Sequence, residues 1–279
     1  MTWQVAPVQS TGADPTSFVS LRLRGLPMTR TNPRVLFAAA TLFAACIPCA
    51  VSAPPANVDA NADEILRSMT NYMAGLKQFS VQTENTIERV TTEGQTIQFV
   101  SPGKVTVSRP DKLLAERRDN VADQIFYYDG KSLTLYNPGT GYYATASVPG
   151  TIDAMLDFAQ EKLDVTAPAG DLIDSRSYDL LMQDVKSGIY VGLETVAGQR
   201  CHHLAYRAGD VDWQVWVHDG ERPYPCRYVI TSKDMAGEPQ FAVEITKFDP
   251  APRIDKAMFH FVPPANAIAV EFQPTSQAR

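Results

Sequence analysis

The side chains that most often carry out chemistry are few in this sequence and do not form a known catalytic pattern. The four histidines are His202, His203, His218 and His260. His202 and His203 are adjacent on a predicted strand, so their side chains point to opposite faces and cannot bind one metal ion together. From residue 54 onward there is no His-Glu-x-x-His, Cys-x-x-Cys or Gly-x-Ser-x-Gly motif and no glycine-rich phosphate loop. The sequence therefore predicts no catalytic residue, no metal site and no cofactor.

Cys201 and Cys226 are the two cysteines beyond the N-terminal region, an even number that predicts a disulfide in an oxidising compartment. A bond between them would close a loop whose chain entropy stabilises the fold by about 3 kcal/mol. The alternative is two separate buried thiols. The two residues lie on the first and third strands of a predicted meander, which is normally too wide a separation for a disulfide.

Arg109 ends the predicted strand 105–109, whose other residues are β-branched or small. A guanidinium stays charged at all physiological pH values, so an arginine that points into the interior of a sheet needs partners there. The alternative is a surface arginine that pairs with Asp111 or Glu116.

Two groups of β-branched and aromatic runs, separated by turn residues, predict antiparallel strands. They lie at 79–90, 96–100, 105–109, 113–117, 124–128, 132–136 and 142–146, and again at 190–196, 199–207, 212–218, 227–231 and 240–248. A helix that starts at the cap Asn61 precedes them, and two helices broken at Pro168-Ala169-Gly170 lie between the groups. We predict an α+β fold in which one large curved antiparallel sheet, an open half-barrel of about eleven strands, is covered by helices.

Alternation along the strands assigns one set of apolar residues to the inner face of the sheet. This set is the predicted hydrophobic ligand-binding surface, with simple core packing as the alternative: Leu133, Leu135, Leu204, Tyr206, Trp213, Val215, Val243 and Ile245. A second set lies on the apolar faces of the two inserted helices and is the predicted lid: Ile152, Met155, Leu156, Tyr178, Leu181 and Met182.

Residues 1–53 are expected to be an N-terminal extension and signal peptide, followed by a single domain over 54–279. Met28 is the expected true start, because Arg30 and Arg34 precede an apolar stretch that ends in Val51-Ser52-Ala53, a typical cleavage site. We expect export to the periplasm. The alternative is a lipid anchor on Cys46, which follows two alanines.

The charge of the exported chain excludes some partners. Removal of residues 1–53 leaves 21 basic and 30 acidic side chains, a net charge of −9 compared with −6 for the whole chain. An acidic chain without a basic stripe has no electrostatic basis for binding nucleic acid.

Four short motifs, taken in order, resemble the LolA/LolB superfamily of periplasmic lipoprotein carriers. They are Val105-Thr106-Val107-Ser108-Arg109-Pro110, the turn Asp129-Gly130-Lys131, Tyr136-Asn137-Pro138, and Phe259-His260-Phe261-Val262-Pro263-Pro264. The block from Cys201 to Thr231 resembles instead a branch of predicted periplasmic proteins of unassigned function.

The resemblance implies a LolA-like fold and a non-catalytic carrier that binds a lipid or an acylated lipoprotein in the concave face of the half-barrel. It also implies that Arg109 is the latch that holds the lid helices closed, and that an envelope protein donates or accepts the cargo. A second hypothesis is an envelope sensor or protein-interaction module on the same fold. A third is an unrecognised enzyme that uses His218, Asp219 or His202.

Overall fold

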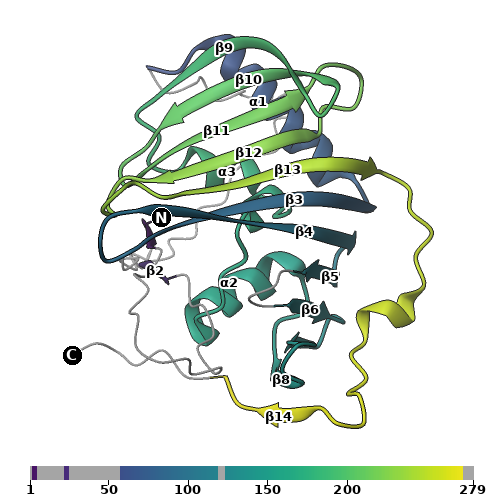
Figure 1. Ribbon diagram of the computed structural model, residues 1–279. Helices are drawn as coiled ribbons and strands as arrows, with labels where there is room; N and C mark the ends of the chain where they lie inside the picture. Colours follow the sequence, from purple (N-terminus) through teal and green to yellow (C-terminus); the bar gives the residue numbers. More distant parts are fainter. Residues whose placement is uncertain (1, 5–21, 25–56, 119–122, 273–279) are drawn as a thin grey trace, which may run out of the picture.

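The computed structural model describes residues 2–4, 22–24, 57–118 and 123–272 of the chain (Figure 1). The main feature is a sheet of twelve strands in the order β14-β8-β7-β6-β5-β4-β3-β13-β12-β11-β10-β9, open because the edge strands β14 and β9 do not pair with each other. The strands are β3 (Gln78–Val90), β4 (Thr96–Ser108), β5 (Lys112–Arg117), β6 (Gln124–Tyr128), β7 (Ser132–Tyr136), β8 (Tyr142–Ser147), β9 (Ser187–Val196), β10 (Gln199–Arg207), β11 (Val211–His218), β12 (Pro225–Ser232), β13 (Gln240–Asp249) and β14 (Ile268–Val270).

All neighbouring strands of this sheet are antiparallel except β14 and β8, which are parallel. The predicted fold class, a large open antiparallel sheet covered by helices, is confirmed. The helical elements are α1 (Ala60–Gly75), α2 (Ile152–Leu163), η1 (Gly170–Leu172), α3 (Ser177–Met182) and η2 (Lys256–Phe259), and β1 (Thr2–Gln4) pairs separately with β2 (Arg22–Arg24).

The prediction was wrong where it split β4 into two strands at Pro102 and Gly103. Proline has no N–H to donate, and this normally excludes it from the interior of a sheet. Here the carbonyl of Pro102 faces the β5 side, where it accepts a hydrogen bond from the backbone N–H of Arg118, one residue beyond the end of β5. The N–H that Pro102 lacks would point to this same side, where β5 has already ended. β4 therefore continues along β3 without a break.

Helix α1 covers the half of the sheet that contains β10–β12. Asp59 caps it by accepting from the backbone N–H of Asn61 at 2.8 Å, so the predicted cap Asn61 was wrong by two residues. Leu66 and Met69 of the helix are buried against Leu204 and Val215 of the sheet in one apolar cluster. The region directly beneath α1 is a packed apolar core.

Helix α2 covers the other half, over β3–β7. Thr151 caps it by accepting from the backbone N–H of Ala154, and Asp164 ends it in the left-handed conformation. Ile152 and Met155 are buried in a second apolar cluster with Phe79 of β3. Helices and strands far apart in the sequence thus share a single inner face.

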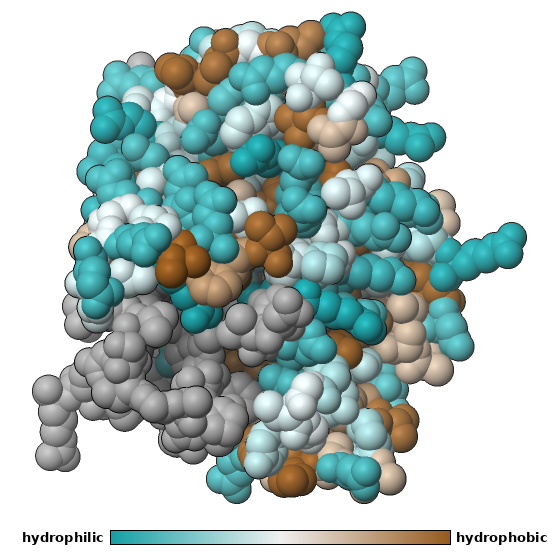
Figure 2. Space-filling model, viewed as in Figure 1, coloured by the Kyte–Doolittle hydropathy of each residue, from teal (hydrophilic) through white to brown (hydrophobic). Residues whose placement is uncertain are grey.

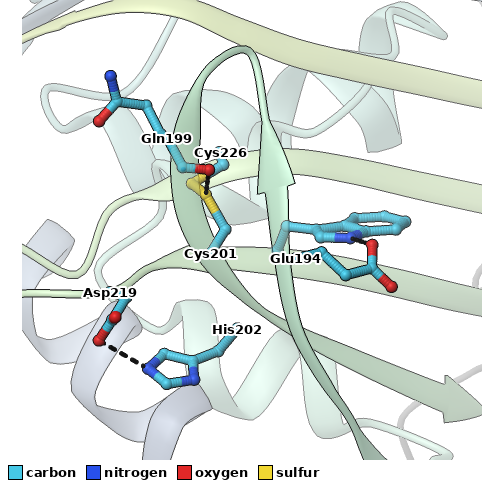
Figure 3. Close-up of a disulfide and its surroundings, with 7 residues drawn as sticks. Glu194, Gln199, Cys201, His202, Asp219 and Cys226 are labelled. Carbon is cyan, nitrogen blue, oxygen red and sulfur yellow. Dashed lines mark hydrogen bonds and ion pairs between the residues drawn. A yellow bond between two sulfur atoms is a disulfide. The ribbon is translucent and has the colours of Figure 1, made fainter.

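Cys201 and Cys226 are bonded to each other, as predicted (Figure 3). They lie on β10 and β12, with β11 between them, and their Cα atoms are 6.7 Å apart. The register of β11 and β12 shifts between Trp216 and Val217, which leaves Cys226 as an extra residue of β12. This β-bulge resolves the expected conflict with strand spacing, because a bulge bends and twists the strand that carries it.

The predicted signal region lies outside the described residues. This includes Met28, Arg30, Arg34, the cleavage site at Val51-Ser52-Ala53 and the alternative anchor Cys46. Within the described part of the chain, no helix has the length and apolar character needed to cross a membrane.

Candidate functional site

A largely apolar cavity of about 280 Å³ lies between the inner face of the sheet and the segment that covers it. Its sheet wall follows β3, where every second residue from Phe79 to Arg89 contributes to the lining. Ten residue steps along a strand correspond to about 30 Å, so the lining extends along most of β3. Neighbouring wall positions come from β4, β5, β6, β7 and β13.

The cavity is closed from above by α2 and by the residues that follow it. Met155, Leu156 and Ala159 of α2 line the cavity, as do residues 165–174, which include η1. We call α2 and residues 165–174 together the cover segment. At one end the lining residues Phe79 and Met73 are buried, whereas at the other end, near the β3–β4 turn, the lining residues Ile87 and Arg89 are only partly buried. The cavity is therefore more accessible from the β3–β4 turn.

The predicted ligand-binding residues fall into two groups. Leu133, Val243 and Ile245 line the cavity. Leu135, on the same face of β7 as Leu133, is half-buried and does not line it. The other four predicted positions lie in the packed core beneath α1: Leu204, Tyr206, Trp213 and Val215. These four pack with α1 residues such as Leu66 and Met69 and do not line this cavity.

The predicted lid residues also fall into two groups, one at the cavity and one in the cluster under α1. Met155 and Leu156 line the cavity, and Ile152 is buried beside them in the cluster under α2. The α3 residues Tyr178, Leu181 and Met182 pack instead with the cluster under α1. The Tyr178 hydroxyl donates to the carboxylate of Asp63, and Arg67 lies 3.8 Å above the Tyr178 ring, so α3 is attached to α1.

Arg109 joins the end of β4 to the cover segment. Its Nη2 donates to the carbonyl of Ile173 at 2.7 Å, whereas its buried Nε has no hydrogen-bond partner among the described residues. Burial lowers the pKa of Arg109, and the carboxylates of Asp153 and Asp174 oppose this shift. Arg109 thus contacts the region between the two inserted helices, but it does not line the cavity.

Asp171 of η1 separates this cavity from a second one of about 210 Å³, because it lines both. The Tyr228 hydroxyl donates to its carboxylate at 3.0 Å. Burial raises the pKa of Asp171 to about 6, and the hydrogen bond from Tyr228 opposes that rise. Trp213, a predicted ligand-binding residue, lines the second cavity.

A family model described as predicted periplasmic protein (DUF2092) matches residues 62–273. The chain belongs to this family. The family's description agrees with the expected periplasmic location and with the branch to which the central block of the sequence was assigned. No curated protein sequence matches the chain significantly.

Solved structures with a similar fold share little sequence with this DUF2092 chain. An uncharacterised conserved protein from Thermus thermophilus is 12% identical, with a TM-score of 0.46, and the match covers 76% of this chain and 99% of that one. LprF from Mycobacterium bovis is 14% identical (TM-score 0.45; 71% and 98% covered). The lipoprotein LppX from Mycobacterium tuberculosis is 13% identical (TM-score 0.44; 71% and 100% covered).

The histidines lie away from the cavity lining. His202 contacts the Tyr190 hydroxyl at 3.1 Å and Asp219 at 3.2 Å (Figure 3). His203, on the opposite face, contacts Glu194 at 3.0 Å. Within the described residues, no three His, Cys, Asp or Glu side chains are grouped so that they could hold a metal ion.

Several polar residues of the cavity wall were missed by sequence reasoning. They are Thr83, Asn85, Arg89, Arg117 and Gln124. Strand alternation could have placed Thr83, Asn85 and Arg89 on the same face as Val81, but a polar side chain on a strand is normally assigned to solvent.

Proposed function

We propose that this protein binds a hydrophobic ligand, the acyl chain of a lipid or of an acylated lipoprotein, in the cavity beneath the cover segment. It would carry this ligand within the cell envelope without changing it chemically. The observation that supports the proposal is the lining of the cavity, which is mostly apolar and extends along most of β3. Such a site matches an extended alkyl chain better than a compact polar substrate.

The energies involved permit reversible loading. Burial of a methylene group contributes about 0.8 kcal/mol. The hydrogen bond from Arg109 to Ile173 has a charged donor, for which about 1.5–3 kcal/mol is typical. A few methylene groups would therefore offset the loss of this contact, so the cover segment can open for a ligand and close again without one.

We assign the opening to α2 and residues 165–174, and not to α3. The cover segment contacts the sheet side of the molecule through Arg109 with Ile173 and Tyr228 with Asp171. On its other side, Asp157 and Asp174 form ion pairs with Arg176, the residue before α3, at 3.0 and 2.7 Å. In contrast, α3 is held to α1 through Asp63. The role of Arg109 as a latch is part of this proposal.

A cavity-filling substitution tests the proposal. Ala115 lines the cavity from β5, and Ala115→Trp would occupy the space that the ligand needs. Val100→Trp is the matched control, because Val100 is 56% exposed on the outer face of β4. We expect the neutral fluorescent probe phenylnaphthylamine to bind the wild-type protein and Val100→Trp equally. We expect it to bind Ala115→Trp at least about tenfold more weakly, a difference of about 1.4 kcal/mol.

Equal binding by the two variants, or no binding to the wild type, would contradict the proposal. Native mass spectrometry of delipidated protein, before and after exposure to a cell-envelope lipid extract, then identifies the ligand. If the protein retains no lipid but captures a protein of the envelope, the sensor or interaction function replaces the carrier.

A further inference from the structure

The β3–β4 hairpin extends beyond the neighbouring strand β5 (Figure 1). β4 pairs with β3 along its whole length, from Thr96 to Ser108, but it pairs with β5 only from Gly103 onward. Residues 96–102 therefore have a strand on one side, β3, and no described strand on the other. We call this second side of residues 96–102 the β4 edge.

Two hydrogen bonds show which backbone groups of β4 face this edge. The N–H of Arg109 donates to the carbonyl of Lys77, on the β3 side, at 2.8 Å. The carbonyl of Pro102 accepts from the N–H of Arg118, on the β5 side, at 3.1 Å. Successive residues of a strand direct their N–H and C=O groups to opposite sides. Odd-numbered residues of β4 therefore bond to β3, and even-numbered residues direct both groups to the β4 edge. Before Pro102 the even-numbered residues are Thr96, Gln98 and Val100.

The β4 edge lacks the features that protect the outer edge of the sheet at β9. The register of β9 and β10 shifts at Val191, which forms a bulge, and Val58 forms a bridge to Gly188. A bulge or a covering segment hinders an edge from pairing with another chain. Residues 96–101, in contrast, contain no proline and pair with β3 in an unbroken register. An edge of this kind accepts an additional strand readily.

The inner face of the hairpin continues the wall of the cavity up to the β4 edge. Ile87 and Arg89 of β3 line the cavity, as does Gly103 of β4. Phe99 lies opposite Ile87, and Ile97 lies opposite Arg89, so both β4 residues share the inner face. Apolar side chains reach the surface along this hairpin (Figure 2), where Ile97 is 39% exposed. A chain that leaves the cavity at this end therefore passes along the β4 edge.

We propose that the β4 edge binds the polypeptide part of an acylated ligand as an added antiparallel strand, while the acyl chain occupies the cavity. This inference rests on the proposed function. β5 runs antiparallel to β4 and toward the β3–β4 turn, so a strand added beyond it would continue in the direction of β5. A polypeptide acylated at its N-terminal residue has this direction, because its chain runs away from the acyl group. Backbone hydrogen bonds to the edge give affinity without requiring a particular sequence.

The test uses ligands that share one acyl chain and differ in the attached peptide. They are palmitoylglycine amide, an N-palmitoylated heptapeptide of glycine, serine and threonine, and the same heptapeptide with methylated peptide nitrogens. Each competes with phenylnaphthylamine for the full-length exported protein. We expect the heptapeptide to bind about tenfold more tightly than palmitoylglycine amide, because it adds backbone hydrogen bonds. The methylated heptapeptide has no N–H to donate and should lose this gain.

Two substitutions at one position test the assignment to the β4 edge. Gln98→Pro removes an N–H that points away from β3, so the pairing of β3 with β4 keeps all its hydrogen bonds. The native Pro102 already occupies an equivalent position of the same strand. Gln98→Ala is the matched control, because both variants lose the hydrogen bond from Gln98 Nε2 to Glu88 at 2.9 Å but only proline lacks the N–H. Gln98→Pro should lose most of the gain for the heptapeptide, and Gln98→Ala should keep it. Both should bind palmitoylglycine amide like the wild type.

Amide hydrogen exchange gives a second readout that does not depend on Gln98→Pro being able to fold. In the wild type, exchange at the N–H groups of Gln98 and Val100 should slow when the heptapeptide binds and remain unchanged with palmitoylglycine amide. Exchange at Phe99, whose N–H faces β3, should change much less.

The outcomes separate the two proposals. If the heptapeptide binds no more tightly than palmitoylglycine amide, or if the gain survives in Gln98→Pro, the peptide site is overturned while the carrier function stands. Equally tight binding of the heptapeptide without its palmitoyl group would also overturn the inference, because the edge would then act independently of the cavity. If no acylated ligand displaces phenylnaphthylamine, the carrier function itself is wrong.

Discussion

At the scale of single residues, the role of Arg109 depends on one contact. The sequence indicated only that a permanently charged side chain at the end of a strand needs a partner. The structure gives the carbonyl of Ile173 as that partner, 64 positions further along the chain. An arginine that holds a loop by one hydrogen bond can be replaced without removal of any core packing.

We expect Arg109→Leu to loosen the cover segment while the fold remains intact. Leucine keeps much of the bulk but has no donor. Phenylnaphthylamine should dissociate about tenfold faster, as measured by stopped-flow fluorescence, because about 1.4 kcal/mol of the contact is lost. Arg118→Leu serves as the control for loss of an arginine. Wild-type dissociation kinetics in Arg109→Leu would show that Arg109 is not the latch.

The raised pKa of Asp171 predicts that the stability of the protein depends on pH. Its pKa is raised from 3.8 to about 6, so the folded protein binds a proton between these values that the unfolded chain does not bind. The contribution of Asp171 to the free energy of unfolding is therefore fully present below about pH 4 and is lost as the pH rises to 6.

We expect Asp171→Asn to flatten this part of the stability profile, measured as the urea midpoint at a series of pH values. Asp179→Asn, at an exposed position of α3, is the control. A profile for Asp171→Asn that runs parallel to that of the wild type between pH 4 and 6 would refute the assignment.

At the scale of elements, the sequence predicted where the strands lie along the chain better than it predicted which part of the sheet each helix packs against. The two halves of β4 were each recognised, and only their continuity across Pro102 was missed. The amphipathic character of α3 was recognised too, but its apolar face packs toward the cluster under α1 and not over the cavity. An apolar stripe shows that a helix is buried on one side, whereas its partner depends on the path of the chain.

At this scale, loss of the disulfide should have the largest effect on the free energy of unfolding, because the bond joins β10 to β12 across β11. Chain-entropy models give about 3 kcal/mol for a loop of this size. We expect the double substitution of Cys201 and Cys226 by serine to lower the free energy of unfolding by about 2–5 kcal/mol in urea titrations. Reduction should destabilise the wild type to a similar extent and leave the double variant unchanged.

Thiol alkylation under denaturing, non-reducing conditions checks the bond directly. Neither cysteine of the exported protein should be labelled. Labelling of both would show that the thiols are free in the envelope.

At the scale of the whole molecule, one inner face of the sheet carries two different kinds of packing. Under α1, residues such as Leu66 and Tyr206 are almost completely buried. Under α2, residues of the second cluster such as Phe79 and Leu133 also border the cavity. The shorter helix and the irregular residues 165–174 do not fill the space above the strands. The proposed ligand would occupy this space.

The sequence alone determined the features that depend on local patterns. Alternation and turn residues predicted the antiparallel strands, helical spacing predicted the three helices, and the cysteine count predicted the disulfide. The short motifs and the central block placed the chain among predicted periplasmic proteins. Each of these depends on residues close together in the chain, or on a count, so no tertiary information was needed.

Only the tertiary structure decided which inner-face residues meet a cavity. Leu133 and Leu204 have the same chemical character and the same kind of position on a strand, but Leu133 borders the cavity and Leu204 lies beneath α1. The polar residues of the cavity wall, such as Thr83 and Gln124, were hidden for the same reason. Whether space remains above a residue depends on the volume of side chains from distant segments, which no local pattern encodes.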